Sequence, residues 1–361
     1  MRTFGVEEEY LLVDAATGEA RSVARQVLRR AVDEEHREGF DAEIQQEMLE
    51  LVTEPQSTLE GMLAAIRANR AAADELAREH GARIVALASP PLAVEAHAMP
   101  GERYQRILEH YGMTARESLT CGQHVHVSVE SREEAVAVLD RIRIWLPVVL
   151  ALSANSPYSA GQDTGHASYR AQLWRRWPTA NPTPYFGSVE ALDAYEREML
   201  DTGVLLDENM LHFEARASKR YPTVEVRVAD VSLFAESSAT IAALIRGLVG
   251  AAADEWQRGL EPPKPSTDTL RLASWRASIS GVDGDLVHPL TGRPASARDV
   301  VQALAAHVAG ALAETGDEVA VRAWLERMLD GGTGAHWQRA ALARTADLHA
   351  VVGEAADATQ A

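Results

Sequence analysis

The sequence has little positive charge, one cysteine and few aromatic residues. Its 361 residues include 35 Lys and Arg against 53 Asp and Glu, which gives a net charge of −18. Nucleic acids and anionic membranes bind basic surfaces, so we expect neither as a partner. The single cysteine, Cys121, excludes an intramolecular disulfide and suits a reducing cytoplasm.

Long hydrophobic runs are also missing. The most apolar stretch, residues 135–157, is interrupted by Asp140, Arg141, Arg143 and Pro147. A membrane-spanning helix needs roughly 20 consecutive apolar residues, so this stretch predicts a buried helix instead. The opening "MRTFGVEEEY" lacks the apolar segment of a secretory signal. We therefore expect a cytoplasmic protein.

Several common catalytic motifs are absent. The chain has no G-x-x-x-x-G-K-[ST] loop, and its glycine cluster "DGGTGAH" has no Lys-Ser at a helix start. It also has no H-E-x-x-H or C-x-x-C spacing for zinc. If ATP is used, it does not lie on a Walker loop.

The hydrophobic pattern predicts a single α+β domain. Strands are expected at 5–14, 48–53, 82–91, 121–130 and 223–231, and helices at 21–38, 59–81, 131 to about 153, 189–200 and 233–258. Residues 155–187 form a long aromatic loop, and connections of that length are usually functional. The "EPPKPST" break separates a core of about 4–258 from a helical C-terminal part of about 266–351, with helices at 297–314, 318–329 and 336–349. We expect the last ten residues to be frayed.

Three of these strands carry one apolar and one polar face, because side chains alternate along a strand. The polar faces carry Glu7 and Glu9, His124 and His126, and Glu225 and Arg227, and Glu50 adds a fourth strand. Glu8 falls on the opposite face, with Val6 and Tyr10. Glu8 is therefore expected to be structural, whereas Glu7 and Glu9 are expected to need a cation.

The composition of the polar faces favours a metal site over ordinary exposed strands. Two carboxylates on one face repel each other unless a cation neutralises them. Carboxylate oxygens suit Mg²⁺ or Mn²⁺ better than zinc. Two alternatives stay open for His124 and His126: a zinc pair and hydrogen-bonded structural histidines.

The arginines also allow two interpretations. Arg227 beside Glu225 is either a structural ion pair or a group that faces a transferring phosphoryl group. Arg170, in the long loop, is either exposed or bound to an anionic substrate. Cys121 is expected to pack in the core and not to act as a nucleophile.

The ordered stretches "GVEEEYLLVD", "EIQQEMLELVT", "CGQHVHVSV", "LSANSPYSAGQDTGHASYR", "WPTANPTPYFGS" and "YPTVEVRVADV" carry a resemblance. With them the chain resembles the glutamate–cysteine ligase type 2 family, in its bacterial carboxylate-amine ligase branch, over residues 4–250. The resemblance implies a glutamine-synthetase-like fold. In that fold a curved antiparallel sheet holds ATP and metals on its concave face, with helices on the other face.

The resemblance also implies functional residues and an activity. The implied metal ligands are Glu7, Glu9, Glu43, Glu50, His124 and Glu225; the catalytic residues are Glu225 and Arg227; and the substrate- or ATP-binding residues are Arg170, Arg220 and His126. The implied reaction joins a carboxylate, such as an amino acid, to an amine with Mg²⁺ or Mn²⁺ and ATP. An acyl phosphate is its intermediate, and a homodimer is suggested.

Three departures from the family pattern leave the substrates open. Pro222 stands where many members have glycine, "FEARASKRYP" matches loosely, and "SPYSAGQ" lacks a larger aromatic residue. Glutamate–cysteine ligation is the family label, and it is compatible here with either a main or a side activity. The alternatives are a guanidino or amine phosphotransferase of the same fold, a metal-dependent hydrolase, and a non-catalytic protein that retains the fold.

Overall fold

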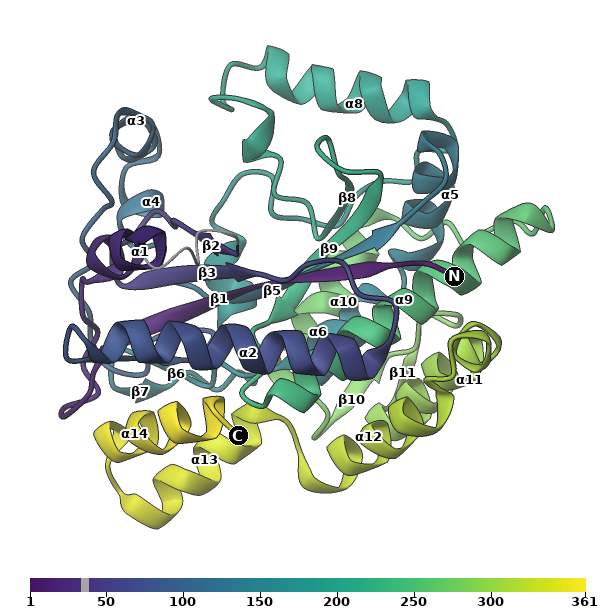
Figure 1. The fold of residues 1–361 in the computed structure, drawn as a ribbon. Helices are drawn as coiled ribbons and strands as arrows, with labels where there is room; N and C mark the ends of the chain where they lie inside the picture. The colour runs from purple at the N-terminus through teal and green to yellow at the C-terminus, as the bar shows by residue number, and fades with distance from the viewer. Residues whose placement is uncertain (34–38) are drawn as a thin grey trace.

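The computed structural model describes residues 1–33 and 39–361. One antiparallel sheet dominates the molecule, with helices on both sides of it (Figure 1). Its strands are β1 (Phe4–Asp14), β2 (Phe40–Asp41), β3 (Met48–Val52), β4 (Ala82–Val85), β5 (Gly122–Ser128), β8 (Ala215–Ala217) and β9 (Thr223–Asp230). Their order is β2-β3-β1-β5-β9-β8, β4 pairs with β1, and all pairs are antiparallel.

The apolar face of the sheet is covered by three helices. These are α2 (Leu59–Arg78), α6 (Leu146–Ser153) and α9 (Ala235–Gln257). Alternate valines of β5 and β9, among them Val125 and Val226, are fully buried in one cluster with Leu244 and Leu248 of α9. Burying such side chains stabilises the fold by about 1.5–3 kcal/mol each, which fixes the face on which the intervening polar residues lie.

The other helices surround this core. They are α1 (Ala24–Asp33), α3 (Glu102–Tyr111), α4 (Met113–Arg116), α5 (Arg132–Ile142), α7 (Arg170–Trp174), α8 (Val189–Asp201), α10 (Thr267–Ser280), α11 (Ala297–Thr315), α12 (Glu318–Gly331), α13 (Gly334–Thr345) and α14 (Leu348–Thr359), with a short 3₁₀ helix at Glu208–Met210. Two small hairpins pair β6 (Tyr158–Ser159) with β7 (Gln162–Asp163) and β10 (Asp285–Val287) with β11 (Pro294–Ser296). Within the described ranges, no helix is long and apolar enough to cross a membrane.

Four sequence-based expectations about elements need correction. The helix expected from 131 is split into α5 and α6, because Pro147 lies at the start of α6 and lacks the N–H that a continuous helix requires. The C-terminal end is not frayed: Val352, Ala355 and Ala356 of α14 are buried against the sheet. The loop 155–187 contains α7 and the β6–β7 hairpin, and the region after the proline break forms α10. The helix expected over 21–38 begins at Ala24, and its end lies outside the described residues.

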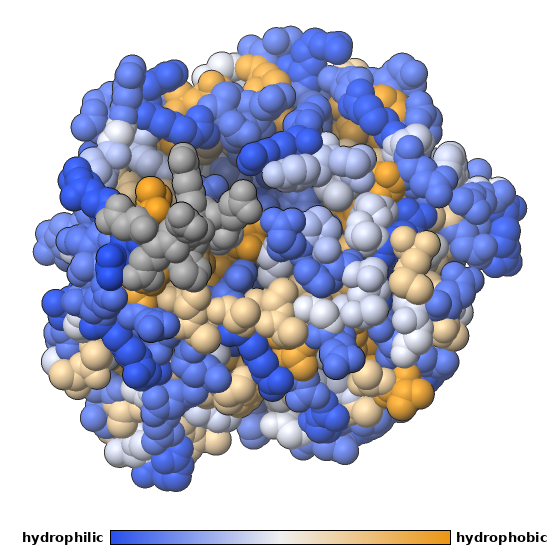
Figure 2. All heavy atoms as spheres, viewed as in Figure 1, coloured by the Kyte–Doolittle hydropathy of each residue, from blue (hydrophilic) through white to orange (hydrophobic). Residues whose placement is uncertain are grey.

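The polar face of the sheet is the side toward α3, α4 and α8, away from α2. In the same view, the surface is largely hydrophilic and is hollowed below α8, on this side of the sheet (Figure 2). The C-terminal helices α11 and α12 share one hydrophobic cluster with α9 and the strands, so they pack on the same core. The proposed division into two parts stays a prediction.

Candidate active site

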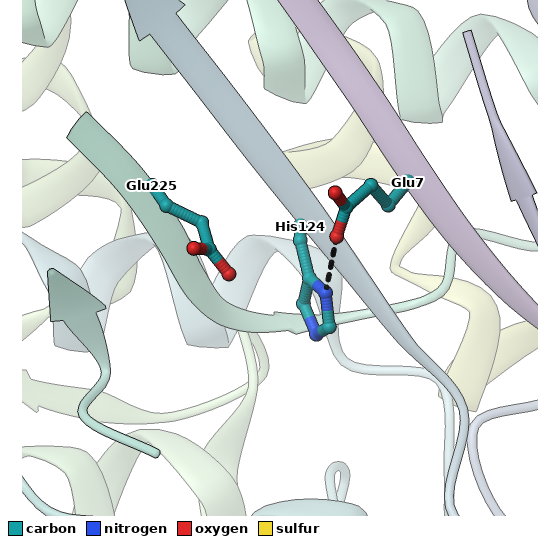
Figure 3. A group of neighbouring side chains, drawn as sticks. All are labelled: Glu7, His124 and Glu225. Carbon is teal, nitrogen blue, oxygen red and sulfur yellow. Dashed lines mark hydrogen bonds and ion pairs between the residues drawn. The ribbon is translucent and has the colours of Figure 1, made fainter. Parts of the chain in front are cut away.

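Four neighbouring strands bring their polar residues to one place. Glu7 of β1 is paired in register with His124 of β5, and His126 of β5 is paired with Glu225 of β9. On the other side of β1, Glu9 is paired with Glu50 of β3. Figure 3 shows Glu7, His124 and Glu225 converging from three adjacent strands. The alternation predicted from the sequence therefore places these side chains on a common face.

Glu7, His124 and Glu225 form one group whose ligand atoms lie within 4.8 Å of one another. The Nδ1 of His124 lies 3.1 Å from Glu7 Oε2, and the Nε2 of His126 lies 3.1 Å from Glu7 Oε1. Burial opposes ionisation of Glu7, but hydrogen bonds with the two histidines hold its pKa well below the usual range. Glu7 is therefore a carboxylate over the whole physiological range.

Glu225 is held between two arginines. Arg216 of β8 donates from Nε to Glu225 Oε2 at 2.7 Å and from Nη2 to Oε1 at 3.2 Å, and Arg227 donates to Oε1 from the same strand. Burial disfavours the charge on Glu225, yet the two guanidinium groups keep its pKa far below the usual range. Much of the charge on Glu225 is thus already neutralised by the protein.

Glu9, Glu50 and His124 form a second group, again with ligand atoms within 4.8 Å. Glu43, in the segment between β2 and β3, shares a hydrogen bond with Glu50. Removal from solvent and the neighbouring Glu9 raise the pKa of Glu43 to about 7. Removal from solvent and Glu43, Glu7 and Glu9 likewise raise the pKa of Glu50 well above its usual range. Burial is the larger cause of both rises, and the crowding of carboxylates on this side of the site adds to it.

His124 is arranged as a metal ligand would be. In the tautomer whose Nδ1–H donates to Glu7, its Nε2 carries the lone pair. That Nε2 is buried, lies 3.7 Å from Glu9 Oε1 and makes no hydrogen bond with any described residue. Burial and the charge on Arg227 lower the pKa of His124, so the ring is neutral, as metal ligation requires.

The donor atoms fit a divalent metal in the second group best. Carboxylate oxygens with one imidazole suit Mg²⁺ or Mn²⁺. Among the described residues, no arginine donates a hydrogen bond to Glu9 or Glu50, whereas two arginines donate to Glu225 in the first group. A cation bound between Glu9, Glu50 and His124 would neutralise charge that the protein leaves uncompensated.

Arg170 lies at the edge of the same site and not on the surface. It is 2% exposed, and its guanidinium lies 5.7 Å from the centre of the Trp174 ring, over which Arg227 also lies at 6.0 Å. A Cβ at Gly122 would come within 2.1 Å of Arg170 Nη2, so glycine is required there for the arginine to fit. Two buried guanidinium groups thus gather beside the carboxylates.

Arg220 is the one predicted site residue that the structure does not bring to this cluster. It is exposed in the turn between β8 and β9, 5.2 Å from the ring centre of Tyr221. Tyr221 in turn contacts the edge of His126, whose Nδ1 lies 3.0 Å from Thr223 Oγ1. All other predicted site residues lie on or beside the polar face. Their functional roles stay predictions.

Sequence reasoning missed Arg216 and His212. Arg216 lies on β8, a strand of three residues, too short for its alternation to be recognised. His212 follows the 3₁₀ helix and lies against Trp174 and Trp177, with ring centres 5.0 and 5.4 Å apart. A lone histidine in an irregular segment gives no periodic signal. Only its position between the matched stretches of the chain could have drawn attention to it.

Comparisons with known proteins identify the family of the chain. The model of the family described as Glutamate-cysteine ligase family 2 (GCS2) matches residues 3–358. A protein from Streptomyces coelicolor named putative glutamate–cysteine ligase 2 is 48% identical over 362 residues, covering all of both chains. A protein from Paenarthrobacter aurescens named putative glutamate–cysteine ligase 2-1 is 47% identical over 99% of this chain and 95% of its own.

Solved structures support the fold. A glutamate–cysteine ligase from Francisella tularensis, in complex with AMP, superposes with a TM-score of 0.70 at 14% identity over 99% of this chain and 88% of its own. A bifunctional glutathione synthetase from Pasteurella multocida superposes with a TM-score of 0.73 at 16% identity over 99% of this chain and 52% of its own. The expected α+β fold is confirmed. The chain belongs to glutamate–cysteine ligase family 2, and the expected class of enzyme, an ATP-dependent ligase that forms carbon–nitrogen bonds, is confirmed with it.

Proposed function

We propose that the chain joins a small carboxylic acid, such as an amino acid, to an amine through an acyl phosphate formed from ATP. The observation that carries this proposal is the division of charge on the polar face. Carboxylates that accept no hydrogen bond from any described arginine or lysine gather on β1 and β3, and buried guanidinium groups gather on β9 and α7. A reaction between the phosphates of ATP and a substrate carboxylate needs carboxylates that hold a metal ion and guanidinium groups that stabilise the anionic substrates.

The residues that would hold a divalent metal are Glu9, Glu50 and His124, with Glu7, Glu43 and Glu225 beside them. A metal ion bound there would offset the charge of the ATP phosphate oxygens. Glu225 has a second task in this proposal, because its ion pairs with Arg216 and Arg227 fix where both guanidinium groups point. Arg227 then contacts the transferring phosphoryl group.

The reaction proceeds in two displacements. An oxygen of the substrate carboxylate attacks the γ-phosphorus, and ADP leaves with the electron pair of the broken P–O bond. The amine nitrogen then attacks the acyl carbon, and phosphate leaves. Arg227 and Arg170 stabilise the anionic groups in both steps by charge-assisted hydrogen bonds. The pKa of the lone thiol, Cys121, is raised by burial, and no protein nucleophile is needed.

The test is an ADP-release screen over paired acids and amines with Mg²⁺, followed by mass analysis of the product. Glutamate with cysteine is the first pair, because it is named for the relatives. We expect ADP, free phosphate and an amide in equal amounts for at least one pair. A stable phosphorylated product without free phosphate would establish a phosphotransferase instead. Turnover without ATP and with zinc would establish a hydrolase.

Variants make the test specific to the site. Arg227→Ala is expected to abolish amine-dependent ADP formation without unfolding the protein. Arg220→Ala, outside the cluster, serves as the matched control and is expected to lose far less. An Arg227→Ala enzyme with full activity would remove this residue from the proposed machinery.

A further inference from the structure

A cavity of 220 Å³ that opens to solvent adjoins the carboxylate side of the site. Glu9 and Glu43 form the wall that it shares with the candidate metal ligands. Tyr104, Ile107, Trp174 and Trp177 form much of the rest, so the interior is mainly apolar and aromatic. The cavity is below the roughly 300–1,000 Å³ usual for drug-sized ligands, so a molecule of only a few heavy atoms fits.

His212 also lines this cavity, and no described residue forms a hydrogen bond with its ring. Its backbone N–H donates to Thr179 Oγ1 at 2.9 Å, and the ring packs against Trp174 and Trp177. Its Nδ1 is buried without a hydrogen bond to any residue of the described chain. A buried polar atom left unpaired costs about 1–3 kcal/mol, so a ligand that pairs with it gains that interaction.

The ring of His212 is neutral. Burial, with the charges on Arg227 and Arg216, lowers its pKa well below the usual range. A neutral imidazole can accept a proton, whereas an imidazolium cannot. With Nδ1 unpaired, the ring can offer a hydrogen-bond and proton acceptor to a molecule in the cavity.

Charge in the cavity wall favours an amine over an acid. Two glutamates face it, and the cationic residue in its lining, Arg103, is already paired with Asp207. The guanidinium groups that would attract a carboxylate, those of Arg170 and Arg227, do not line the cavity. They lie 5.7 and 6.0 Å from the centre of the Trp174 ring. Aromatic rings such as those of Tyr104 and Trp174 also bind cationic or polar amines through their faces.

We propose that this cavity binds the amine substrate, a small amine with a compact apolar group and no carboxylate, and that His212 accepts its proton. The inference rests on the proposed function. The amine nitrogen forms the C–N bond to the acyl carbon, and the C–O bond to phosphate breaks with its electron pair going to phosphate. The proton that the nitrogen loses passes to the imidazole of His212, which later releases it to water.

A matched pair of amines tests the substrate class. Cysteamine and cysteine share the same nitrogen and thiol, and only cysteine carries a carboxylate. With the acid identified in the screen, we expect the kcat/KM for cysteamine to be at least about 10-fold higher than that for cysteine. This ratio corresponds to a penalty of roughly 1.4 kcal/mol for the carboxylate of cysteine. A preference for cysteine would overturn the proposed class.

Hydroxylamine separates the two half-reactions. It is neutral near pH 7 and small enough to trap an acyl phosphate without filling the cavity, and it gives a hydroxamate. We expect His212→Asn to lower amide formation from an alkyl amine by about 10². Hydroxamate formation should change far less, because hydroxylamine needs no base. The defect should shrink as the pKa of the amine falls, which a purely structural role of His212 would not produce.

Two further variants complete the experiment. Ile107→Trp, which fills the cavity, is expected to raise the KM for the amine and leave the KM for ATP unchanged. His110→Asn, on the same helix as Ile107 but exposed, is the matched control. A raised KM for ATP in Ile107→Trp would show that the cavity takes the nucleotide and would overturn the inference. Absence of hydroxamate from the wild-type enzyme would instead reject the proposed function itself.

Discussion

The two faces of β1 treat adjacent glutamates in opposite ways. On the helix-covered face, Glu8 is buried and paired with Arg70 at 2.6 Å, and it accepts a hydrogen bond from Tyr10. On the polar face, Glu7 and Glu9 meet histidines and two further carboxylates. One face supplies a permanent internal cation. The polar face leaves its negative charge available to a bound ligand.

The difference identifies which charges are structural. A buried ion pair whose remaining hydrogen bonds are satisfied is stable in itself, and Arg70 donates further to the carbonyls of Ser232 and Leu233. On the polar face, burial and neighbouring carboxylates raise the pKa values of Glu43 and Glu50. Charge that the protein does not neutralise is the stronger indication of a ligand site.

The largest expected effect is on stability, at Glu8. Glu8→Gln leaves the guanidinium of Arg70 buried without its counter-charge, so we expect a loss of about 3–5 kcal/mol in the free energy of unfolding. Urea denaturation measures this loss. Glu75→Gln, exposed on the same helix as Arg70, is the control. The folded Glu8→Gln protein should retain most of its activity; a stable but inactive variant would place Glu8 in the site.

The next effect is on activity, at Glu9. Glu9→Gln removes a charge from the group with Glu50 and His124, and we expect Mg²⁺-dependent ADP release to fall roughly 10²–10³-fold. The melting temperature without metal should stay the same or rise, because Glu9→Gln removes one of several neighbouring negative charges and so reduces their repulsion. The comparison fails if Glu8→Gln and Glu9→Gln lose equal activity.

Metal binding should stabilise the protein through the carboxylates of the polar face alone. At 100 times its dissociation constant, Mg²⁺ is expected to add about 2.7 kcal/mol to the stability of the wild-type protein. Thermal unfolding with increasing Mg²⁺ measures this. Glu50→Gln should abolish most of the gain, whereas Glu75→Gln should keep it. An equal gain in both variants would place the metal elsewhere.

The smallest effect concerns pH in the absence of metal. The pKa of Glu43 is raised to about 7 in the folded state, so the folded protein binds its proton more tightly than the unfolded chain does. The stabilisation from that proton is complete below about pH 4.5 and is lost as the pH rises through about 7. We expect Glu43→Gln to flatten this loss in unfolding scans between pH 5 and 8. Added Mg²⁺ should flatten it in the wild type.

The sequence predicts the sheet face well because its signal is local. Alternation alone places Glu7, Glu9, His124 and Glu225 on one side, since a strand has a period of two. The same rule separates Glu8 from its neighbours. Predicting the face on which these residues lie requires no knowledge of distant contacts.

Residues from irregular segments could not be predicted in this way. Arg216 and Arg220 lie four positions apart in one hairpin, yet only Arg216 reaches Glu225. His212 and Trp174 meet across 38 positions of chain because their segments fold over the sheet. Nothing periodic distinguishes such residues from exposed ones, so their placement depends on tertiary packing.

The contacts of Arg70 also connect distant parts of the chain. Its guanidinium donates to the carbonyl of Leu233, 163 positions away, and to that of Thr359, 289 positions away. Closing loops of that length costs conformational entropy, which Arg70 and the packing around it must offset. Arg70 also pairs with Glu8, the residue between Glu7 and Glu9. One side chain thus ties the last helix of the chain to the strand that carries two candidate metal ligands.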